Sequence, residues 1–334
     1  ASTIIALPAR DLAPHSQYHA RMLCPLALLL LLTSPTLADT LDVGPGQTYP
    51  RIESALAAAK PGDTLLVHPG TYDRVAALIR VPRLTIRAVP GDAPTGFRGN
   101  GFEYSGIGST PRAIVQFDPQ AEGCTLDGFE LSGARNATHN GAAVRINQAD
   151  HVTVRNCTIH DCDMGIMSGG DGRGGGAADQ RIEQCLIYAN GAPAEPGFSH
   201  NLYLGGTSVV VSACEIRTST AGHNLKSRAH YTRIEYCWIH DSANREIDLV
   251  DARGDTDTPG SDAVLLGNII VKSRDCRGNR GVIHRHIEGG RSVRWNERTT
   301  SPVSAAVSWS DGPRGLRQRP CDERTLDRAR PSPA

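Results

Sequence analysis

A pattern of eight residues recurs along the middle of this chain of 334 residues and limits what the chain can fold into. Apolar residues stand at its third and eighth positions, and a cysteine stands at its sixth position in four copies. The copies recur at intervals of about 23 to 31 residues, with Gly, Asn and Asp between them. They begin at residues 124, 152, 180, 209, 232 and 263. A repeat of this length is typical of solenoids, in which each repeat packs on its neighbours.

Short alternating segments with turn residues between them fit one coil of a parallel β-helix, in which successive coils stack ~4.8 Å apart. The composition agrees with this. Apolar residues make up 39% of the chain, aromatic residues only 5%, and there are 35 glycines. Such values argue against a helical bundle or a membrane protein and favour a β-rich chain with many turns.

Four cysteines, Cys157, Cys185, Cys214 and Cys237, share the sixth position of the repeat. In an oxidising compartment, four such cysteines are compatible with disulfides. One repeated position would face the interior of a solenoid, where small thiols pack well. We therefore expect reduced core cysteines, with disulfides as the alternative, and the Cys-x-x-Cys spacing of metal sites is absent.

The beginning of the chain looks like a targeting segment. Arg21 and Met22 precede a leucine-rich run at residues 26–32, and small residues stand at positions 36 and 38. The run is shorter than the ~20 residues that span a bilayer, and the whole is typical of a cleaved signal peptide. We expect residues 1–21 to be an upstream extension and residues 22–38 a signal peptide. The protein is then secreted or periplasmic, with no membrane span.

The end of the chain differs from the repeats. From Arg285 onward there are ten arginines and no lysine, and the spaced apolar pattern stops. Residues 285–334 are expected to be a disordered tail or the product of a shifted reading frame near His284–Arg285. The regular domain is expected to cover residues 39–284.

The segment before the repeats supports a specific resemblance. Residues 42–56 read DVGPGQTYPRIESAL, and residues 59–72 read AKPGDTLLVHPGTY. This resembles the entry cap of right-handed parallel β-helix proteins of the pectate-lyase-like superfamily. The resemblance implies an all-β, single-stranded, right-handed parallel β-helix with a short N-terminal capping helix near residues 52–59. The superfamily includes lyases, hydrolases, epimerases, esterases and tailspikes, so fold alone does not give function.

A polar column follows the cysteine strands. If Leu202, Leu225 and Ile247 point inward, strand alternation turns their neighbours outward. Two polar ladders result, Asn201–Asn224–Glu246 and Tyr203–Lys226–Asp248, with His200, His223 and Arg245 at the strand entrances. We expect these nine side chains to form one functional face.

Lysine is scarce in this chain. Of the 35 basic residues, only Lys60, Lys226 and Lys272 are lysines. Uronate lyases need a cation beside the C6 carboxylate, a base for the C5 proton and an acid for the leaving oxygen. A lysine and an arginine one coil apart resemble those of β-helical alginate lyases and chondroitinase B. That resemblance implies Lys226 as the base and Arg245 as the acid. His200, Asn201, Tyr203, His223, Asn224, Glu246 and Asp248 are the expected substrate-binding residues.

One departure from that family concerns calcium. Its acidic residues before the lysine are replaced here by Thr218, Ser219, Thr220 and Ala221. We therefore predict no metal ligand and no required cofactor, although Ca²⁺ held by Glu246 and Asp248 stays open.

Other functions remain open from the sequence. A glycoside hydrolase could use Glu246 with Asp248, and Asp251 nearby, as its carboxyl pair. A non-catalytic cell-surface protein could bind carbohydrate on the same face. The equal numbers of acidic and basic residues, 35 each, leave no electrostatic footprint for nucleic acid. The expected partner is an acidic polysaccharide, bound by a monomer.

Overall fold

The computed structural model describes residues 38–287, apart from 92, 195, 252–255 and 257–259, together with residues 304–310. The predicted extension (residues 1–21), the signal peptide up to residue 37 and most of the 285–334 segment lie outside the described residues. No helix within the described part is long and apolar enough to cross a membrane.

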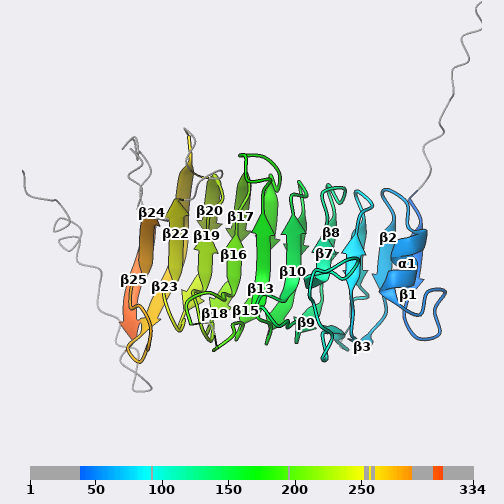
Figure 1. Cartoon of the computed structure of the whole chain (residues 1–334), viewed down its shortest axis with the longest axis horizontal. Helices are drawn as coiled ribbons and strands as arrows, with labels where there is room; N and C mark the ends of the chain where they lie inside the picture. Colours follow the sequence, from blue (N-terminus) through cyan, green and yellow to red (C-terminus); the bar gives the residue numbers. More distant parts are fainter. Residues whose placement is uncertain are drawn as a thin grey trace, which may run out of the picture. The chain divides into compact units, whose positions relative to one another are not determined.

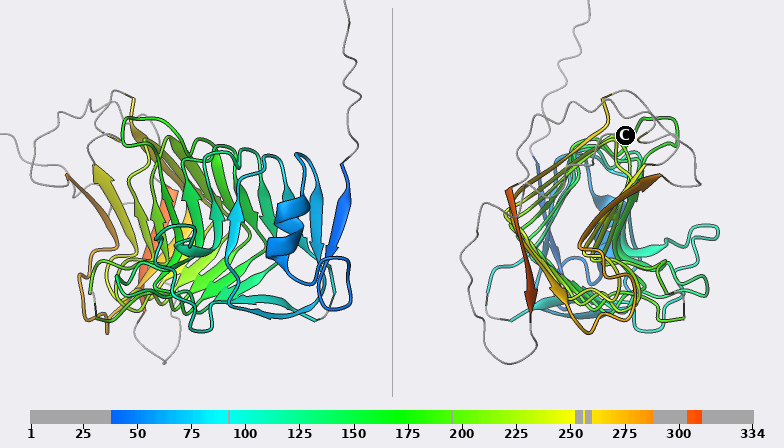
Figure 2. Two further views of the ribbon diagram at one scale, coloured as in Figure 1. Left: turned by 45° about the vertical axis from the view of Figure 1, so that its right-hand side comes forward. Right: turned by 90° about the vertical axis from the view of Figure 1, so that its left-hand side faces the viewer.

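The described chain winds through stacked coils, and most coils contribute one short strand to each of three parallel ladders (Figure 1). The view along the stack shows the three ladders as separate walls (Figure 2, right). The first ladder contains β1 (Thr40–Val43), β2 (Thr64–Val67), β5 (Thr85–Ala88), β8 (Thr125–Asp127), β11 (Thr153–Arg155), β14 (Gln180–Glu183), β17 (Ser208–Ser212), β20 (Tyr231–Glu235) and the start of β23 (Asp262–Ser273).

The second ladder begins one corner later in each coil. It contains β3 (Gly70–Asp73), β6 (Thr95–Arg98), β9 (Glu130–Ser132), β12 (Thr158–His160), β15 (Leu186–Tyr188), β18 (Glu215–Arg217), β21 (Trp238–His240), the end of β23 and β25 (Ser304–Ser310). The third ladder carries the predicted site. It contains β4 (Ala77–Ile79), β7 (Ala113–Phe117), β10 (Ala142–Asn147), β13 (Met164–Gly169), β16 (Leu202–Leu204), β19 (Leu225–Ser227), β22 (Ile247–Asp251) and β24 (Ile283–Ile287).

Aliphatic columns fill the interior as the repeat predicts. Val154, Ile182 and Val211 lie in register on neighbouring strands of the first ladder and have no exposed surface. Ile159 and Ile187 do the same on the second ladder. Each such side chain contributes about 1.5–3 kcal/mol on burial, so the column positions of the repeat are the core of the fold.

The corner between the first two ladders is a single left-handed residue. Asn156, Gln184, Ala213 and Tyr236 occupy it in successive coils, with φ between 52° and 54°. This conformation costs a non-glycine residue roughly 1–2 kcal/mol. Gly267 has the same place one coil later, where an added Cβ would lie 2.7 Å from the Tyr236 ring. A side chain at position 267 would therefore require the exposed Tyr236 ring to shift.

The cysteine column follows these corners. Cys157, Cys185, Cys214 and Cys237 are buried and carry free thiols, as predicted. Each thiol donates a hydrogen bond to the carbonyl two residues earlier, at 3.1–3.3 Å. The thiols thus satisfy backbone groups at the corner while filling the core.

Helix α1 (Ile52–Ala58) covers the first coils, as expected for the cap (Figure 2, left). Ile52 and Ala55 are buried in the main core, and the helix packs against β1, β2 and β4. The Glu53 carboxylate accepts a hydrogen bond from the Ala76 amide at 3.0 Å. The helix thereby shields core side chains that an open first coil would expose to water.

Candidate functional site

Six outward side chains of the third ladder lie in register, one on each of six successive strands. Neighbours in this row, which we call the outer column, are paired across the parallel strands. Its members are Arg145 on β10, Met167 on β13, Tyr203 on β16, Lys226 on β19, Asp248 on β22 and His284 on β24. The predicted alternation at Tyr203, Lys226 and Asp248 therefore places these three side chains next to one another.

Two basic side chains, Lys226 and Arg228, surround the ring of Tyr203. The Lys226 amine lies 5.0 Å from the centroid of the Tyr203 ring. Arg228 donates a hydrogen bond from Nη1 to the Tyr203 hydroxyl oxygen at 2.7 Å, and its guanidinium carbon lies 6.0 Å from the ring centroid. Two cations thus border one phenol on a half-buried face, where cation–π attraction helps to hold them.

Asp248 is held by three side chains, although it has only 1% of its surface exposed. Its Oδ1 atom accepts from Arg245 Nη1 at 2.8 Å and lies 3.0 Å from His284 Nδ1. Its Oδ2 atom lies 3.3 Å from His223 Nε2. These partners compensate for the desolvation of the carboxylate. The carboxylate is thus held between two histidines and an arginine.

The predicted strand-entrance residues form a stack. The rings of His200 and His223 are 4.7 Å apart and within 9° of parallel. His200 Nδ1 accepts from the His223 amide at 2.9 Å, and His223 Nδ1 accepts from the Arg245 amide at 3.1 Å. With Nδ1 accepting, the proton of each neutral ring is on Nε2. The protonated Nε2 atom of His223 lies 3.3 Å from Asp248 Oδ2.

Burial lowers the pKa of His200 well below its ordinary value, and the nearby His223 and Lys226 add to this effect. His200 is therefore neutral near pH 7. Its ring lies edge-on to Tyr203, with centroids 5.3 Å apart. His200 thus supports the tyrosine from the interior side of the corner.

The expected outward position of Asn201, Asn224 and Glu246 is wrong. None of the three has any exposed surface. The Asn201 amide donates to Asn224 Oδ1 at 2.8 Å, and the Asn224 amide donates to Glu246 Oε2 at 2.5 Å. They precede β16, β19 and β22, so they lie at the corner, where strand alternation does not apply. At the corner an inward side-chain amide can hydrogen-bond to backbone groups of the turn. The Asn201 amide, for example, donates to the carbonyl of Arg217.

This amide ladder ends on a buried lysine. Lys272 lies in β23 with no exposed surface, and its Nζ atom contacts Glu246 Oε1 at 3.0 Å. The same amine donates to the carbonyl and hydroxyl of Ser242, both at 2.9 Å, and to the carbonyl of Asn244. The scarcity of lysine that points to Lys226 applies equally to Lys272.

His284 was also not among the predicted residues. The inward column of Leu225 and Ile247 continues to Ile283, and the outward column of Lys226 and Asp248 continues to His284. An alignment of the repeats that includes one more coil places His284 in this column. The expected end of the domain at residue 284 leaves that coil out of the alignment.

Glu246 and Asp248 do not converge on one point, because Glu246 is inside the coil with Lys272 while Asp248 contacts Arg245 and His223. They do not form the cation site that was left open above. No group of three His, Cys, Asp or Glu side chains in the described ranges could hold a metal ion.

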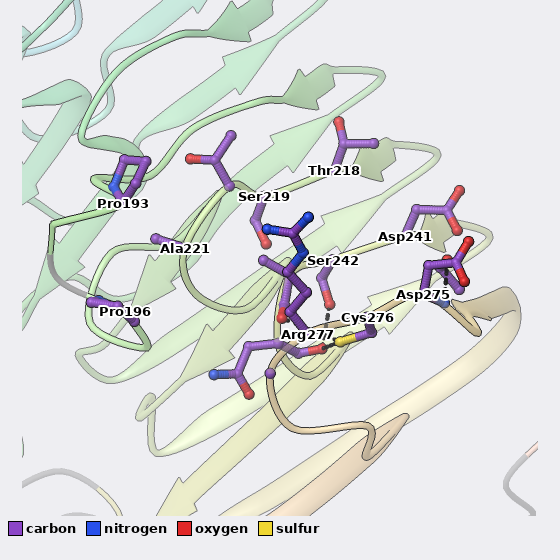
Figure 3. A pocket seen from close by; sticks show the side chains of 15 residues that line it. Pro193, Pro196, Thr218, Ser219, Ala221, Asp241, Ser242, Asp275, Cys276 and Arg277 are labelled. Carbon is purple, nitrogen blue, oxygen red and sulfur yellow. Dashed lines mark hydrogen bonds between the residues drawn. The ribbon is translucent and has the colours of Figure 1, made fainter.

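A cavity of about 610 Å³ lies among the turns that precede β19, β22 and β24 (Figure 3). Ser219, Ser242 and Cys276 line it, and Arg277 extends across it. Its Asp241 is hydrogen-bonded to His240 at 2.8 Å. None of the predicted site residues lines this cavity.

The stacked coils, three parallel ladders and capping helix define a parallel β-helix protein. Residues 115–284 match the family model described as "Right handed beta helix region". The chain belongs to that family. No curated protein matches it in sequence.

Several solved structures are similar to this one at low sequence identity. Pectin methylesterase from Aspergillus niger is 15% identical, over 81% of this chain and 92% of that chain, with a TM-score of 0.49. An alginate lyase from Paenibacillus sp. str. FPU-7 is 17% identical, over 75% of this chain and 99% of that chain, also with a TM-score of 0.49. The PL6 family alginate lyase AlyGC is 13% identical, over 82% of this chain and 39% of that chain, with a TM-score of 0.42.

Proposed function

We propose that this protein is an exported enzyme that cleaves a uronate-containing polysaccharide by β-elimination on the outer column. The observation that carries the proposal is the arrangement around Tyr203. An amine lies 5.0 Å from the ring centroid, and a guanidinium donates to the hydroxyl at 2.7 Å. Export is inferred from the signal-peptide pattern of residues 22–38.

The reaction needs a base and an acid that can exchange a proton afterwards. Lys226 takes the C5 proton of the uronate as the base, and the Tyr203 hydroxyl gives its proton to the leaving C4 oxygen. The resulting phenolate is stabilised by Arg228 and by the newly formed Lys226 ammonium. A proton then returns from Lys226 to Tyr203, which restores both groups.

This assignment differs from the expectation that Arg245 is the acid. An arginine keeps its proton at any ordinary pH, so it is a poor proton donor. Arg245 is also bound to Asp248 at 2.8 Å. We propose that Arg245 holds Asp248 in place, and that Arg228 contributes the positive charge that neutralises the uronate carboxylate.

The interior position of Glu246 weakens the glycoside hydrolase alternative. A hydrolase needs two carboxyl groups that face the same sugar bond. Glu246 is fully buried and paired with Lys272, so it cannot serve with Asp248. Carbohydrate binding without catalysis is the remaining alternative. A measurement of substrate turnover distinguishes it from β-elimination.

The test measures ultraviolet absorbance from unsaturated uronate products on alginate, polygalacturonate, chondroitin and heparin-type polymers, with and without Ca²⁺. Lys226→Ala and Tyr203→Phe are compared with Lys60→Ala, a control at an exposed lysine. We expect one polymer to be cleaved by the parent chain and by the control, and not by the two site variants. Absorbance that stays flat on every polymer, with binding to one of them, would instead establish a non-catalytic module.

A further inference from the structure

The cavity of about 610 Å³ lies close to the outer column (Figure 3). Its turns lead into β19, β22 and β24, the strands that carry Lys226, Asp248 and His284. Asn244 lines the cavity and stands four residues before Asp248, so the two Cα atoms are at most about 14 Å apart. A polymer on the outer column can therefore place a neighbouring unit in the cavity.

The side chain of Asn244 has an unsatisfied acceptor in this lining. Its Oδ1 atom is buried and accepts no hydrogen bond from the described part of the chain. The corresponding oxygens of Asn201 and Asn224 each accept a side-chain amide inside the coil. A buried polar atom without a partner is energetically unfavourable. At a cavity wall, a ligand that donates a hydrogen bond would satisfy it.

The charged groups of the lining are two carboxylates, on Asp241 and Asp275, and one guanidinium, on Arg277. The side chains of Asp275 and Arg277 have no ion pair or hydrogen bond with the described residues, and Asp241 is bound to His240 at 2.8 Å. A uronate carboxylate brings only acceptors and a negative charge, so it matches Arg277 alone. A sugar hydroxyl both donates and accepts, so it matches the acidic groups, the arginine and the Asn244 oxygen.

Apolar groups complete the lining. Figure 3 shows Pro193 and Pro196 on one side of the cavity and the two aspartates on the other. A volume of about 300–1,000 Å³ with apolar walls and a few convergent polar groups is typical of sites for small ligands. The prolines offer an apolar surface to the C–H groups of a sugar ring.

We propose that this cavity is a subsite for a neutral sugar unit, held by Asn244, Asp275 and Arg277 near the bond that is cleaved. The inference rests on the proposed function for the presence of uronate in the polymer. It makes the substrate a heteropolymer, in which uronate units alternate with sugars that carry no carboxylate. A polymer of uronate alone would place a carboxylate against Asp241 and Asp275, which is unfavourable because the charges are alike.

The experiment measures binding by isothermal titration calorimetry to the full chain carrying Lys226→Ala, so that substrate is not consumed. Asn244→Ala and Arg277→Gln are added in turn, and Asn279→Ala is the matched control. Asn279 is exposed on the turn that carries Arg277 and does not line the cavity. Two probes, unsulfated chondroitin and hyaluronan, alternate uronate with a neutral sugar. The other two, alginate and polygalacturonate, contain uronate alone.

We expect Asn244→Ala to weaken binding of an alternating polymer by roughly tenfold, the effect of about one lost hydrogen bond. The control should leave this affinity unchanged. Because the Asn244 oxygen has no partner in the free protein, Asn244→Ala should not lower the Tm. A lowered Tm with unchanged affinity would make Asn244 a structural residue and overturn the subsite.

The remaining outcomes separate this inference from the proposed function. Cleavage of alginate or polygalacturonate by the parent chain, with no binding of either alternating polymer, would leave the lyase and remove the subsite. Binding of an alternating polymer that depends on Asn244, without cleavage, would keep the subsite and remove the lyase. Weaker binding of a pure polyuronate in Arg277→Gln, with no effect of Asn244→Ala, would show that the cavity takes a carboxylate and overturn the assignment to a neutral sugar.

Discussion

The carboxylate of Glu246 and the amine of Lys272 lie 3.0 Å apart in the interior of the coil, and neither side chain has any exposed surface. The pair ends a ladder of neutral amides that runs through Asn201 and Asn224. A buried ion pair contributes little compared with apolar residues of the same shape, but breaking one partner is costly. The pair therefore makes one edge of the site sensitive to a single substitution.

Lys272→Met should lower the free energy of unfolding by about 3–5 kcal/mol, because it leaves the Glu246 carboxylate buried without a counterion. The double variant Glu246→Gln/Lys272→Met should recover part of this loss, since glutamine continues the amide ladder. Urea unfolding measures both. A double variant no more stable than the single one would contradict the ion-pair explanation.

Arg228→Gln should reduce kcat more than it raises KM. The arginine donates to the Tyr203 oxygen, and that bond gains most strength when the phenolate develops in the transition state. We expect a fall in kcat of about 10²-fold, measured by steady-state kinetics on the polymer that the parent chain cleaves. A change in KM alone would mean that Arg228 only binds substrate.

The lowered pKa of His200 predicts how stability depends on pH. The ordinary pKa is 6.5 and the folded value is well below it. Between these two values the unfolded chain takes up the proton more readily than the folded one. This contribution to stability is therefore complete above about pH 6.5 and is lost as the pH falls.

The corresponding measurement is the Tm of the parent chain and of His200→Gln between about pH 7.5 and 5.5. We expect a steeper fall in the parent chain, because glutamine does not titrate. Parallel curves for the two proteins would show that His200 is not the group responsible.

Buried thiols should be unreactive in the native protein. Burial raises the pKa of Cys124 to about 11 and that of Cys162 to about 12, and the thiolate is the reactive form. We expect no alkylation of either cysteine by iodoacetamide near pH 8 before unfolding, and complete alkylation in urea. Peptide mass spectrometry locates the label, and native-state labelling of Cys162 would disprove its burial.

Much of the fold could be predicted from the repeat, because a solenoid places equivalent residues in columns. The inward positions of Val154 and Ile159 and the cysteine column follow from aligning the copies. The outward positions of Tyr203 and Lys226 follow from alternation within a strand.

The failures occur where the chain leaves the strand. Asn224 and Glu246 stand one residue before β19 and β22, and the corner turns them inward. Sequence does not show where a three-residue strand begins, so alternation extended to the residue before the strand assigns it to the wrong face. The long-range contact of Lys272 with Glu246 spans 26 residues, and no local pattern reports it.

The parallel register has a consequence for how such a molecule can change in evolution. Lys226 and Asp248 are neighbours only because each coil returns the chain to the same column. An insertion of one whole coil between them would keep every inward residue inward and separate the two by about 4.8 Å more. An insertion of one residue within a strand would reverse the faces of the residues that follow it. The site can therefore be lengthened only in steps of one coil. A related chain with one more coil would present a longer face to the polymer.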